Sequence, residues 1–494
     1  MKRTKNNYFI IELPLITEIW QEDIIDKRLE CGRYIFNELL GKTLTRYKEM
    51  IKTKRYRNLI QTLHDPTCDK DLFWGEMNEL LKEYKLTHFD IVKDVKLMQH
   101  HFKKHLHSQI CQEIADRVWK SISSIFHKQN RKVHFKKFNQ FNSLSGKQAY
   151  TGICFKNEYI DWTGLNLKIK YPTNGKSLDY LNNYLFPCLN NLKYCKIVRK
   201  YIRRKRRYYV QMVFQGEDVK SRYSVGSGRV GIDIGTSTIA IVSDSCVELL
   251  ELASNAQKYE QEKKIVQRKL DNSRRSTNSN KFNTDGTIKK GNKDKWVKSK
   301  NYLKLEKQLK ELNRKQRVAR SLSHNILTNF ILSLGDQFFV EKMNFAGLAK
   351  RSKKPTERRK DGKCKKKKRF GKSICNRAPA MLLEILNRKL NYFGLQLNKI
   401  NTQKCKASQY NHMTREYKPK TLSERWTFVG GHKLQRDLYS AFLISNVSKD
   451  LESFDQQLCE QNFNNFLYLH NNKINELTKY KESNDYKFLS CMGI

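Results

Sequence analysis

The stretch RVGIDIGTSTIAIVSD at residues 229–244 decides the fold of this chain. It contains two apolar segments joined at Gly-Thr-Ser-Thr, a pattern typical of two consecutive β-strands. Asp233 interrupts the apolar pattern of the first segment. A carboxylate in a buried strand is costly unless it is paired or binds a metal ion. Asp233 is therefore the first candidate for a functional residue.

Two further acidic residues lie in comparable places. Glu341 follows the apolar run of DQFFVEKMNF (336–345), and Asp437 opens an amphipathic helix in QRDLYSAFLI (435–444). Three such carboxylates could converge to hold two Mg²⁺ ions, because hard cations prefer oxygen ligands. A metal pair of this kind activates water against a phosphodiester. Each residue alone has an ordinary alternative: a turn acceptor for Asp233, a lysine partner for Glu341, a helix cap for Asp437.

The charge of the chain indicates a polyanionic partner. The 494 residues include 97 Lys or Arg and 49 Asp or Glu, a net charge of +48. A lysine-rich genome would raise Glu together with Lys, so composition drift does not account for this excess. Counterion release from phosphates gives such a chain affinity for nucleic acid. No apolar run of about 18 residues appears, so no membrane span is expected. The twelve scattered cysteines predict a reduced, intracellular protein.

Basic and aromatic residues alternate in the stretch RKVHFKKFNQFNSLSG (131–146), a pattern that can contact phosphates and stack bases. A very basic turn follows at 199–207, and another basic run lies at 350–372. An ordinary solvated turn is the alternative for the second stretch. The candidate nucleic-acid-binding residues are Lys136, Lys137, Phe138, Arg203, Arg204, Arg206, Arg207, Lys353, Lys354, Arg358 and Arg359.

The Gly-Ile-Asp-Ile-Gly-Thr-Ser string also occurs in the phosphate loop of sugar kinases and actin-like ATPases. Those enzymes need a second Asp-Gly phosphate loop and a Gly-rich adenosine motif, and neither is found here. Instead, the three acidic motifs resemble the RuvC nuclease domain of the transposon-encoded TnpB family, relatives of compact type V CRISPR effectors. Asp233 in GIDIGTST matches the first motif. Glu341 in FFVEKMNFAGLAK matches the second, and Asp437 in QRDLYSAFLI the third.

The resemblance covers nearly the whole chain and implies an α/β multidomain fold. It would combine a RuvC (RNase H-like) nuclease domain with a helical recognition domain and a β-barrel wedge domain. The implied ranges are 1–19 and 131–224 for the wedge domain, 20–130 for the recognition domain, 225–400 and 433–480 for the nuclease domain with a helical insert at 254–325, 401–432 for a degenerate zinc-ribbon-like module that binds target nucleic acid, and 481–494 for a tail.

The helical insert and the 401–432 module of this outline carry further expectations. Two charged helices are expected at 255–271 and 301–325, and the polar segment between them is expected to be mobile. TnpB proteins usually carry a four-cysteine zinc ribbon, but residues 401–432 keep only Cys405, with Ser408 in place of the next cysteine. His412 and His432 would give three ligands without a fourth. We therefore expect no zinc and a module held by packing around Trp426 and Phe428.

The resemblance implies an RNA-guided DNA endonuclease that acts beside a short flanking DNA motif. A guide RNA transcribed from the transposon or locus would pair with double-stranded target DNA. Asp233, Glu341 and Asp437 would bind two Mg²⁺ ions and hydrolyse the phosphodiester, with the insert and the 350–372 run near the single strand that enters the site. The location would be the cytoplasm of a prokaryote, at the nucleoid.

Two other functions stay open. One is a guide-directed repressor without nuclease activity, which loss of a carboxylate would indicate, yet all three are present. The other is a DNA transposase, which would need a terminal-repeat-binding helix-turn-helix that the sequence does not show. Monomer and dimer also stay open, with a monomer favoured.

Overall fold

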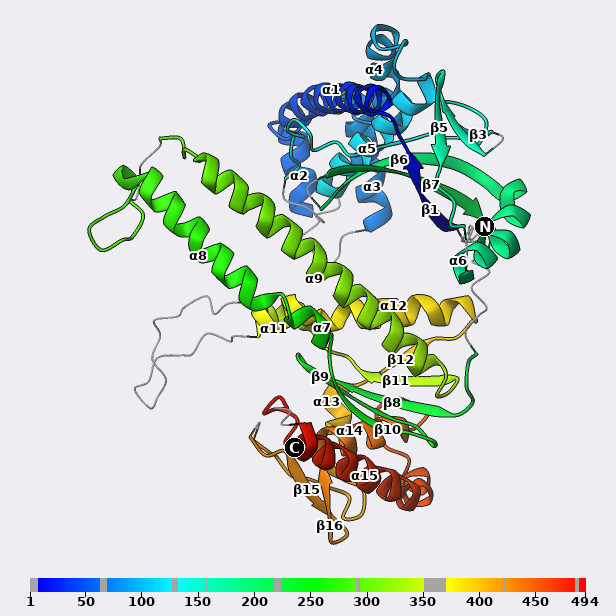
Figure 1. The fold of residues 1–494 in the computed structure, drawn as a ribbon, viewed down its shortest axis with the longest axis vertical. Coiled ribbons are helices and arrows are strands. Elements are labelled where there is room, and N and C mark those ends of the chain that lie inside the picture. The colour runs from blue at the N-terminus through cyan, green and yellow to red at the C-terminus, as the bar shows by residue number, and fades with distance from the viewer. Residues whose placement is uncertain are drawn as a thin grey trace. The chain divides into compact units, whose positions relative to one another are not determined.

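The computed structural model divides the chain into two compact units, Met1–Val219 and Lys220–Ile494. Figure 1 shows helices and strands in both units, in agreement with the expected α/β multidomain class. No helix in the described ranges is long and apolar enough to cross a membrane. The described residues are 8–62, 69–126, 132–156, 158–173, 175–203, 205–216, 224–289, 291, 294–350, 370–421, 423–484 and 488–494.

The first unit is built on a seven-stranded antiparallel sheet in the order β2-β6-β7-β1-β5-β4-β3. β3 also contacts β6, so the sheet is nearly closed, as a small barrel would be. Along β1, β4, β5 and β6, buried side chains alternate with more exposed ones, as a sheet with one buried face requires. The strands are β1 (Tyr8–Ile16), β2 (Ser143–Ser145), β3 (Ile153–Lys156), β4 (Tyr159–Trp162), β5 (Leu165–Ile169), β6 (Leu192–Ile202) and β7 (Lys205–Gln215).

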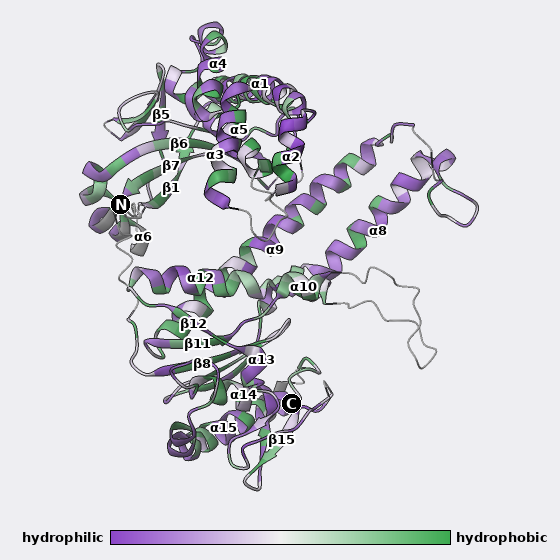
Figure 2. Ribbon diagram, turned by 180° about the vertical axis from the view of Figure 1, so that it is seen from behind, coloured by the Kyte–Doolittle hydropathy of each residue, from purple (hydrophilic) through white to green (hydrophobic). Residues whose placement is uncertain are grey.

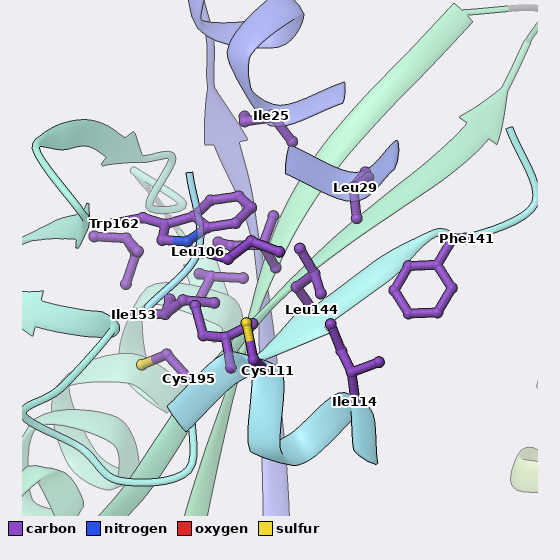
Figure 3. Close-up of a cluster of buried hydrophobic side chains, with 14 of the residues drawn as sticks. Ile25, Leu29, Leu106, Cys111, Ile114, Phe141, Leu144, Ile153, Trp162 and Cys195 are labelled. Carbon is purple, nitrogen blue, oxygen red and sulfur yellow. The ribbon is translucent and has the colours of Figure 1, made fainter. Parts of the chain in front are cut away.

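Helices cover the buried face of this sheet. Ile25 and Leu29 of α1 and Ile114 of α5 are fully buried against Trp162 and the other inward side chains of the sheet (Figure 3). α2 and α3 share a smaller core with the end of α1. Within this unit the sheet and α1, α4 and α5 share one core; their division into wedge and recognition domains stays a proposal. The helices are α1 (Ile19–Met50), α2 (Lys54–Thr62), α3 (Lys70–Glu83), α4 (His88–His101), α5 (Ser108–Phe126), α6 (Gly175–Tyr180), η1 (Leu181–Leu185) and η2 (Phe186–Asn191).

The second unit has a five-stranded mixed sheet in the order β10-β9-β8-β11-β12. β8, β9 and β10 are antiparallel neighbours, whereas β8, β11 and β12 run parallel. Helices α14 and α15 pack on one face, and α9 and α12 pack on the other, so the central strands are buried on both sides. The strands are β8 (Arg229–Ile234), β9 (Thr238–Val242), β10 (Val247–Glu251), β11 (Gln337–Glu341) and β12 (Leu397–Ile400).

Helices and two short β-ribbons complete this unit. Figure 2 shows α8 and α9 as largely hydrophilic. The helices are α7 (Ser254–Gln257), α8 (Glu260–Thr277), η3 (Ser279–Lys281), α9 (Lys300–Leu332), α10 (Phe345–Ala349), α11 (Gly371–Arg377), α12 (Pro379–Tyr392), α13 (Thr402–Cys405), α14 (Arg436–Ser445) and α15 (Gln456–Asn484). The ribbons are β13 (Tyr410–Asn411) with β14 (Glu416–Tyr417), and β15 (Trp426–Val429) with β16 (His432–Gln435).

The described residues between α8 and α9 make specific side-chain contacts. Asn278 is buried, donates to the carbonyl of Val297 at 3.0 Å and accepts from its N–H at 2.8 Å. The rings of Phe282 and Trp296 make an edge contact at 5.8 Å between centroids, and Arg274 lies 5.4 Å above the Trp296 ring. These contacts across the hairpin were not expected, because hydrophobic periodicity cannot detect the partners of polar side chains; the mobility of the segment stays a prediction.

Candidate active site

Asp233 and Glu341 lie side by side at the carboxyl edge of the second sheet. β8 and β11 pair in parallel with Val340 opposite Ile232, so the next residue on each strand is one of the two acids. Asp233 lies inside the ladder with β9, opposite Ala240, and Glu341 pairs with Ile400 of β12. Strand register alone therefore brings both carboxylates to the same edge.

Asp437 reaches the same edge from the first turn of α14. The side chain of Gln435 caps this helix by accepting from the N–H of Leu438 at 2.8 Å. A carboxylate in the first turn is favoured by the helix dipole. α14 packs so closely on β8 that a Cβ on Gly231 would lie 2.0 Å from the carbonyl oxygen of Ala441. This approach sets the position of Asp437 relative to Asp233.

All three predicted carboxylates line one cavity of about 1060 Å³. The Thr236–Ser237 turn forms part of its wall, where the Ser373 hydroxyl donates to the carbonyl of Thr236 at 2.9 Å. Lys420 and Arg425 line the cavity too. A cavity that combines carboxylates with cations can receive a metal ion and a phosphate together.

Burial and mutual repulsion shape the electrostatics of the carboxylates. Burial raises the pKa of Asp233 well above its ordinary value, and the nearby charges of Glu341 and Asp437 raise it further, while Arg436 opposes the rise. Burial raises the pKa of Glu341 to about 7. Burial and mutual repulsion make it costly to ionise these carboxylates side by side. A divalent cation bound between them would offset the repulsion, so the group suits such an ion.

The arrangement is not a closed metal cage as it stands. Within the described ranges, no three His, Cys, Asp or Glu side chains are gathered tightly enough to hold a metal ion. The Asp437 carboxylate instead accepts from Arg436 through Oδ1, at 3.3 Å from Nε and 3.2 Å from Nη2. The residues that would hold Mg²⁺ are Asp233, Glu341 and Asp437. Arg436 contacts only one carboxylate oxygen of Asp437.

Arg436 is a residue of the site that the sequence reading missed. It is only 8% exposed, and its Nη1 donates to the carbonyls of Thr421 and Glu424 at 3.1 and 2.8 Å. It thus ties Thr421 and Glu424 to the carboxylate of Asp437. Its place beside a motif aspartate was visible in the sequence, but the two carbonyls that fix it were not.

We expect Arg436→Gln to weaken metal binding rather than nucleic-acid binding. The loss of the guanidinium frees the Asp437 carboxylate and leaves the carbonyls of Thr421 and Glu424 without their donor. Loss of partners that orient a metal ligand typically lowers metal affinity about 10–100-fold. Calorimetric titration with Mg²⁺ measures this directly, with Arg425→Gln as the control for lost charge in the same cavity. Unchanged Mg²⁺ affinity would show that Arg436 does not orient Asp437.

The C-terminal residues form another part of the site without any signal in the sequence. Leu489, Ser490 and Cys491 line the cavity. Gln435 donates from Nε2 to the carbonyl of Met492 at 3.0 Å, and the Trp426 indole donates to that of Gly493 at 3.1 Å. The segment is therefore anchored at the start of α14, next to Asp437.

The described residues of 401–432, where a degenerate zinc-ribbon-like module was expected, are held differently from the expected packing. Phe428 is 69% exposed, so that part of the expectation is wrong; Thr427 and Val429 point inward instead, because neighbouring residues of a strand alternate. Of the positions considered for zinc, Cys405 and His412 are buried, whereas Ser408 and His432 are exposed.

The His412 side chain is fully buried in this part of the chain. Its backbone N–H donates to the Tyr439 hydroxyl at 3.1 Å, and that hydroxyl lies 2.7 Å from Nδ1. Its ring packs against Phe463, with centroids 4.8 Å apart. Burial lowers the pKa of His412 to about 4, so the imidazole is neutral at pH 7. A neutral, fully buried ring lets hydrogen bonding and aromatic packing hold the module to α14 and α15.

Tyr439→Phe should destabilise the second unit. The change removes one hydroxyl and leaves the His412 N–H and Nδ1 buried without a partner, at about 1–3 kcal/mol for each unsatisfied group. Denaturant unfolding followed by fluorescence measures the loss. Tyr417→Phe is the matched control, because Tyr417 is 46% exposed. Equal stability of the two variants would argue against the role given to the Tyr439 hydroxyl.

The predicted nucleic-acid-binding residues lie in the first unit or outside the described ranges. Lys136, Lys137 and Phe138 are exposed, and Phe138 is 70% so. Arg203 and Arg207 are exposed at the β6–β7 turn, whereas Arg206 pairs with Asp26. Arg204, Lys353, Lys354, Arg358 and Arg359 lie outside the described residues.

No family model matches this chain. Among solved structures, it is similar to a chain of the cryo-EM structure of a Cas12f1–sgRNA–target DNA complex, with a TM-score of 0.45 and 10% identity over 90% of this chain and 99% of that one. It is also similar to a chain of the cryo-EM structure of a CRISPR–Cas12f ternary complex, with a TM-score of 0.28 and 11% identity over 89% and 99%. Both scores are too low to support a function, which therefore depends on the site itself.

Proposed function

We propose that this chain is an RNA-guided DNA endonuclease of the TnpB and compact type V kind. The observation that carries the proposal is the convergence of Asp233, Glu341 and Asp437, from three separate elements, on one cavity. The order of the five strands, with β9 antiparallel beside the parallel β8, β11 and β12, suits an RNase H-like nuclease domain. A single acidic residue in a buried strand would have ordinary explanations, but three at one edge would not.

The residues of the cavity divide the work of hydrolysis between them. Asp233, Glu341 and Asp437 would hold Mg²⁺, and Arg436 would keep Asp437 in place through one oxygen. When bound, two ions supply an activated water and charge stabilisation at the leaving oxygen. Lys420 and Arg425 would hold the phosphate against the carboxylates, and the Lys420 ammonium is fixed by donation to the Thr427 hydroxyl at 2.8 Å.

The first unit would bind the guide RNA and the DNA beside the target. Its exposed Lys136, Lys137, Phe138, Arg203 and Arg207 suit phosphate contact and base stacking. Sequence choice would rest with base pairing, so the protein needs to recognise only backbone shape and a short DNA motif. The +48 charge suits a protein that handles two nucleic acids.

Purification from cells that carry the flanking locus tests the guided function. A discrete RNA transcribed from beside the reading frame should co-purify with the chain, and sequencing of the bound RNA identifies it. If only bulk cellular RNA co-purifies, the guided function fails. If a discrete RNA binds but the complex does not cut matching DNA with Mg²⁺, the repressor function takes its place.

A further inference from the structure

Residues 489–493, which lie beside the label C in Figure 1, form a wall of the candidate active site. Leu489, Ser490 and Cys491 line the cavity that holds the three carboxylates. The backbone N–H of Met492 donates to the carbonyl of Leu489 at 2.9 Å, which closes a turn. The Met492 side chain is only 2% exposed and belongs to the core under α14 and α15. We call residues 489–493 the strap, and it is packed against the core of the second unit.

One cross-strand pair holds two consecutive carbonyls of the strap. Trp426 of β15 and Gln435 of β16 are partners in the β-ladder. The Trp426 indole donates to the carbonyl of Gly493 at 3.1 Å, and Nε2 of Gln435 donates to the carbonyl of Met492 at 3.0 Å. Displacement of the strap would therefore take an acceptor away from both strands at once.

Gln435 connects the strap to the helix that carries Asp437. The Gln435 side chain is fully buried, and its Oε1 accepts from the backbone N–H of Leu438 at 2.8 Å, which caps α14. Its own backbone N–H donates to Nε2 of His470 in α15 at 3.0 Å. Burial lowers the pKa of His470, so the imidazole is neutral at pH 7 and this nitrogen can accept. One buried amide therefore joins the strap to the first turn of α14, where Asp437 lies.

Gly493 lets the strap lie directly against Arg425. Its φ is +73°, and a Cβ at this position would lie 2.5 Å from the Cβ of Arg425 and 3.1 Å from its Cγ. Arg425 lines the cavity, and its carbonyl accepts from the backbone N–H of Arg436 at 2.9 Å. The strap therefore contacts a cation of the cavity as well as the cap of α14.

We propose that the strap is a positioning element of the active site, which keeps Asp437 and Arg425 in the arrangement that binds a metal ion and a phosphate. The inference rests on the proposed nuclease function and gives a role to a segment outside its three acidic motifs. The strap acts on Asp437 through Gln435 and on Arg425 by direct packing. Its displacement should therefore weaken Mg²⁺ binding, whereas a wall without a positioning role would affect stability alone.

Gly493→Ala tests the strap, because the added methyl group would meet Arg425 and push the strap away. Gly394→Ala is the matched control: Gly394 has a φ of +70°, but a Cβ there would meet nothing within 4 Å. Both variants carry the strain of alanine in the left-handed region, and only Gly493→Ala adds the collision. Trp426→Phe is a second variant, which removes the indole donor and keeps an aromatic ring. The measurements are calorimetric titration of the full chain with Mg²⁺ and the Mg²⁺ dependence of cleavage by the RNA complex.

Gly493→Ala should bind Mg²⁺ about tenfold more weakly than Gly394→Ala, as expected when partners that orient a metal ligand are lost. Excess Mg²⁺ should restore its cleavage, and Trp426→Phe should weaken Mg²⁺ binding in the same direction. Equal Mg²⁺ affinity of Gly493→Ala and Gly394→Ala would overturn the strap, and so would unchanged affinity of Trp426→Phe relative to the wild-type chain. A loss of cleavage that excess Mg²⁺ does not restore would also overturn it. If the wild-type chain binds no Mg²⁺, the proposed nuclease function itself fails.

Discussion

Gly231→Ala should abolish cleavage and destabilise the second unit by about 3 kcal/mol, the upper end of the range for overpacked sites. The added methyl group would lie 2.0 Å from the Ala441 carbonyl oxygen and 2.4 Å from the Ser445 nitrogen, and both of these are backbone atoms of α14. Side chains cannot move aside to relieve such a contact, so the helix itself has to shift. Because α14 carries Asp437, the shift separates the third carboxylate from the other two.

Chemical denaturation and a cleavage assay together measure this effect. A misplacement of about 1 Å at a reacting group can cost about 10²-fold in rate, so activity should be lost even where the protein stays folded. Gly235→Ala is the control for stability, because the same methyl group there meets its nearest atom at 3.4 Å. Wild-type stability and activity of Gly231→Ala would show that the close approach of α14 does not position Asp437.

Metal-free protein should lose stability as the pH rises, and Mg²⁺ should restore it. The pKa of Glu341 is raised from 4.5 to about 7 by burial, so the folded state holds a proton that the unfolded state releases at lower pH. The resulting penalty is absent below about pH 4.5, grows between there and about pH 7, and then stays constant. For this one group its full size is about 3 kcal/mol. The raised pKa of Asp233 acts in the same direction.

Thermal unfolding in EDTA and in Mg²⁺, from pH 4.5 to 8, measures this coupling. Glu341→Gln has no carboxylate that can ionise at this position. In EDTA, its stability should therefore fall less between pH 4.5 and pH 7 than that of the wild-type chain. Mg²⁺ should stabilise the wild-type chain more at pH 8 than at pH 5. A pH profile of Glu341→Gln that matches the wild-type profile would contradict the environment assigned to this carboxylate.

The sequence predicted the acidic residues of the site better than their surroundings. Asp233 and Glu341 were visible because each follows or interrupts an apolar run, and such a run can be recognised without tertiary information. Their convergence on one cavity was expected and is found, while their catalytic role stays a prediction. Arg436 was missed because its role depends on the carbonyls of Thr421 and Glu424, which no periodicity reveals.

One error and one set of unforeseen contacts have physical causes. Phe428 was taken as a core residue because it is aromatic, but the alternation of its strand places Thr427 and Val429 inside. The α8–α9 connection was taken as mobile because it is polar, and the two hydrogen bonds between the Asn278 side chain and the Val297 backbone were not foreseen. In both cases residue type alone was a poorer guide than the structure of the segment that contains the residue.

Cleavage of matched DNA by the purified RNA complex in Mg²⁺ tests the central claim most directly. Asp233→Asn, Glu341→Gln and Asp437→Asn are compared with Asp244→Asn, an exposed carboxylate that follows β9. Each of the first three should lower the cleavage rate by about 10³-fold or more while RNA and DNA binding persist, and Asp244→Asn should cut at the wild-type rate. Cleavage at the wild-type rate by any of the three would contradict the assignment of the active site.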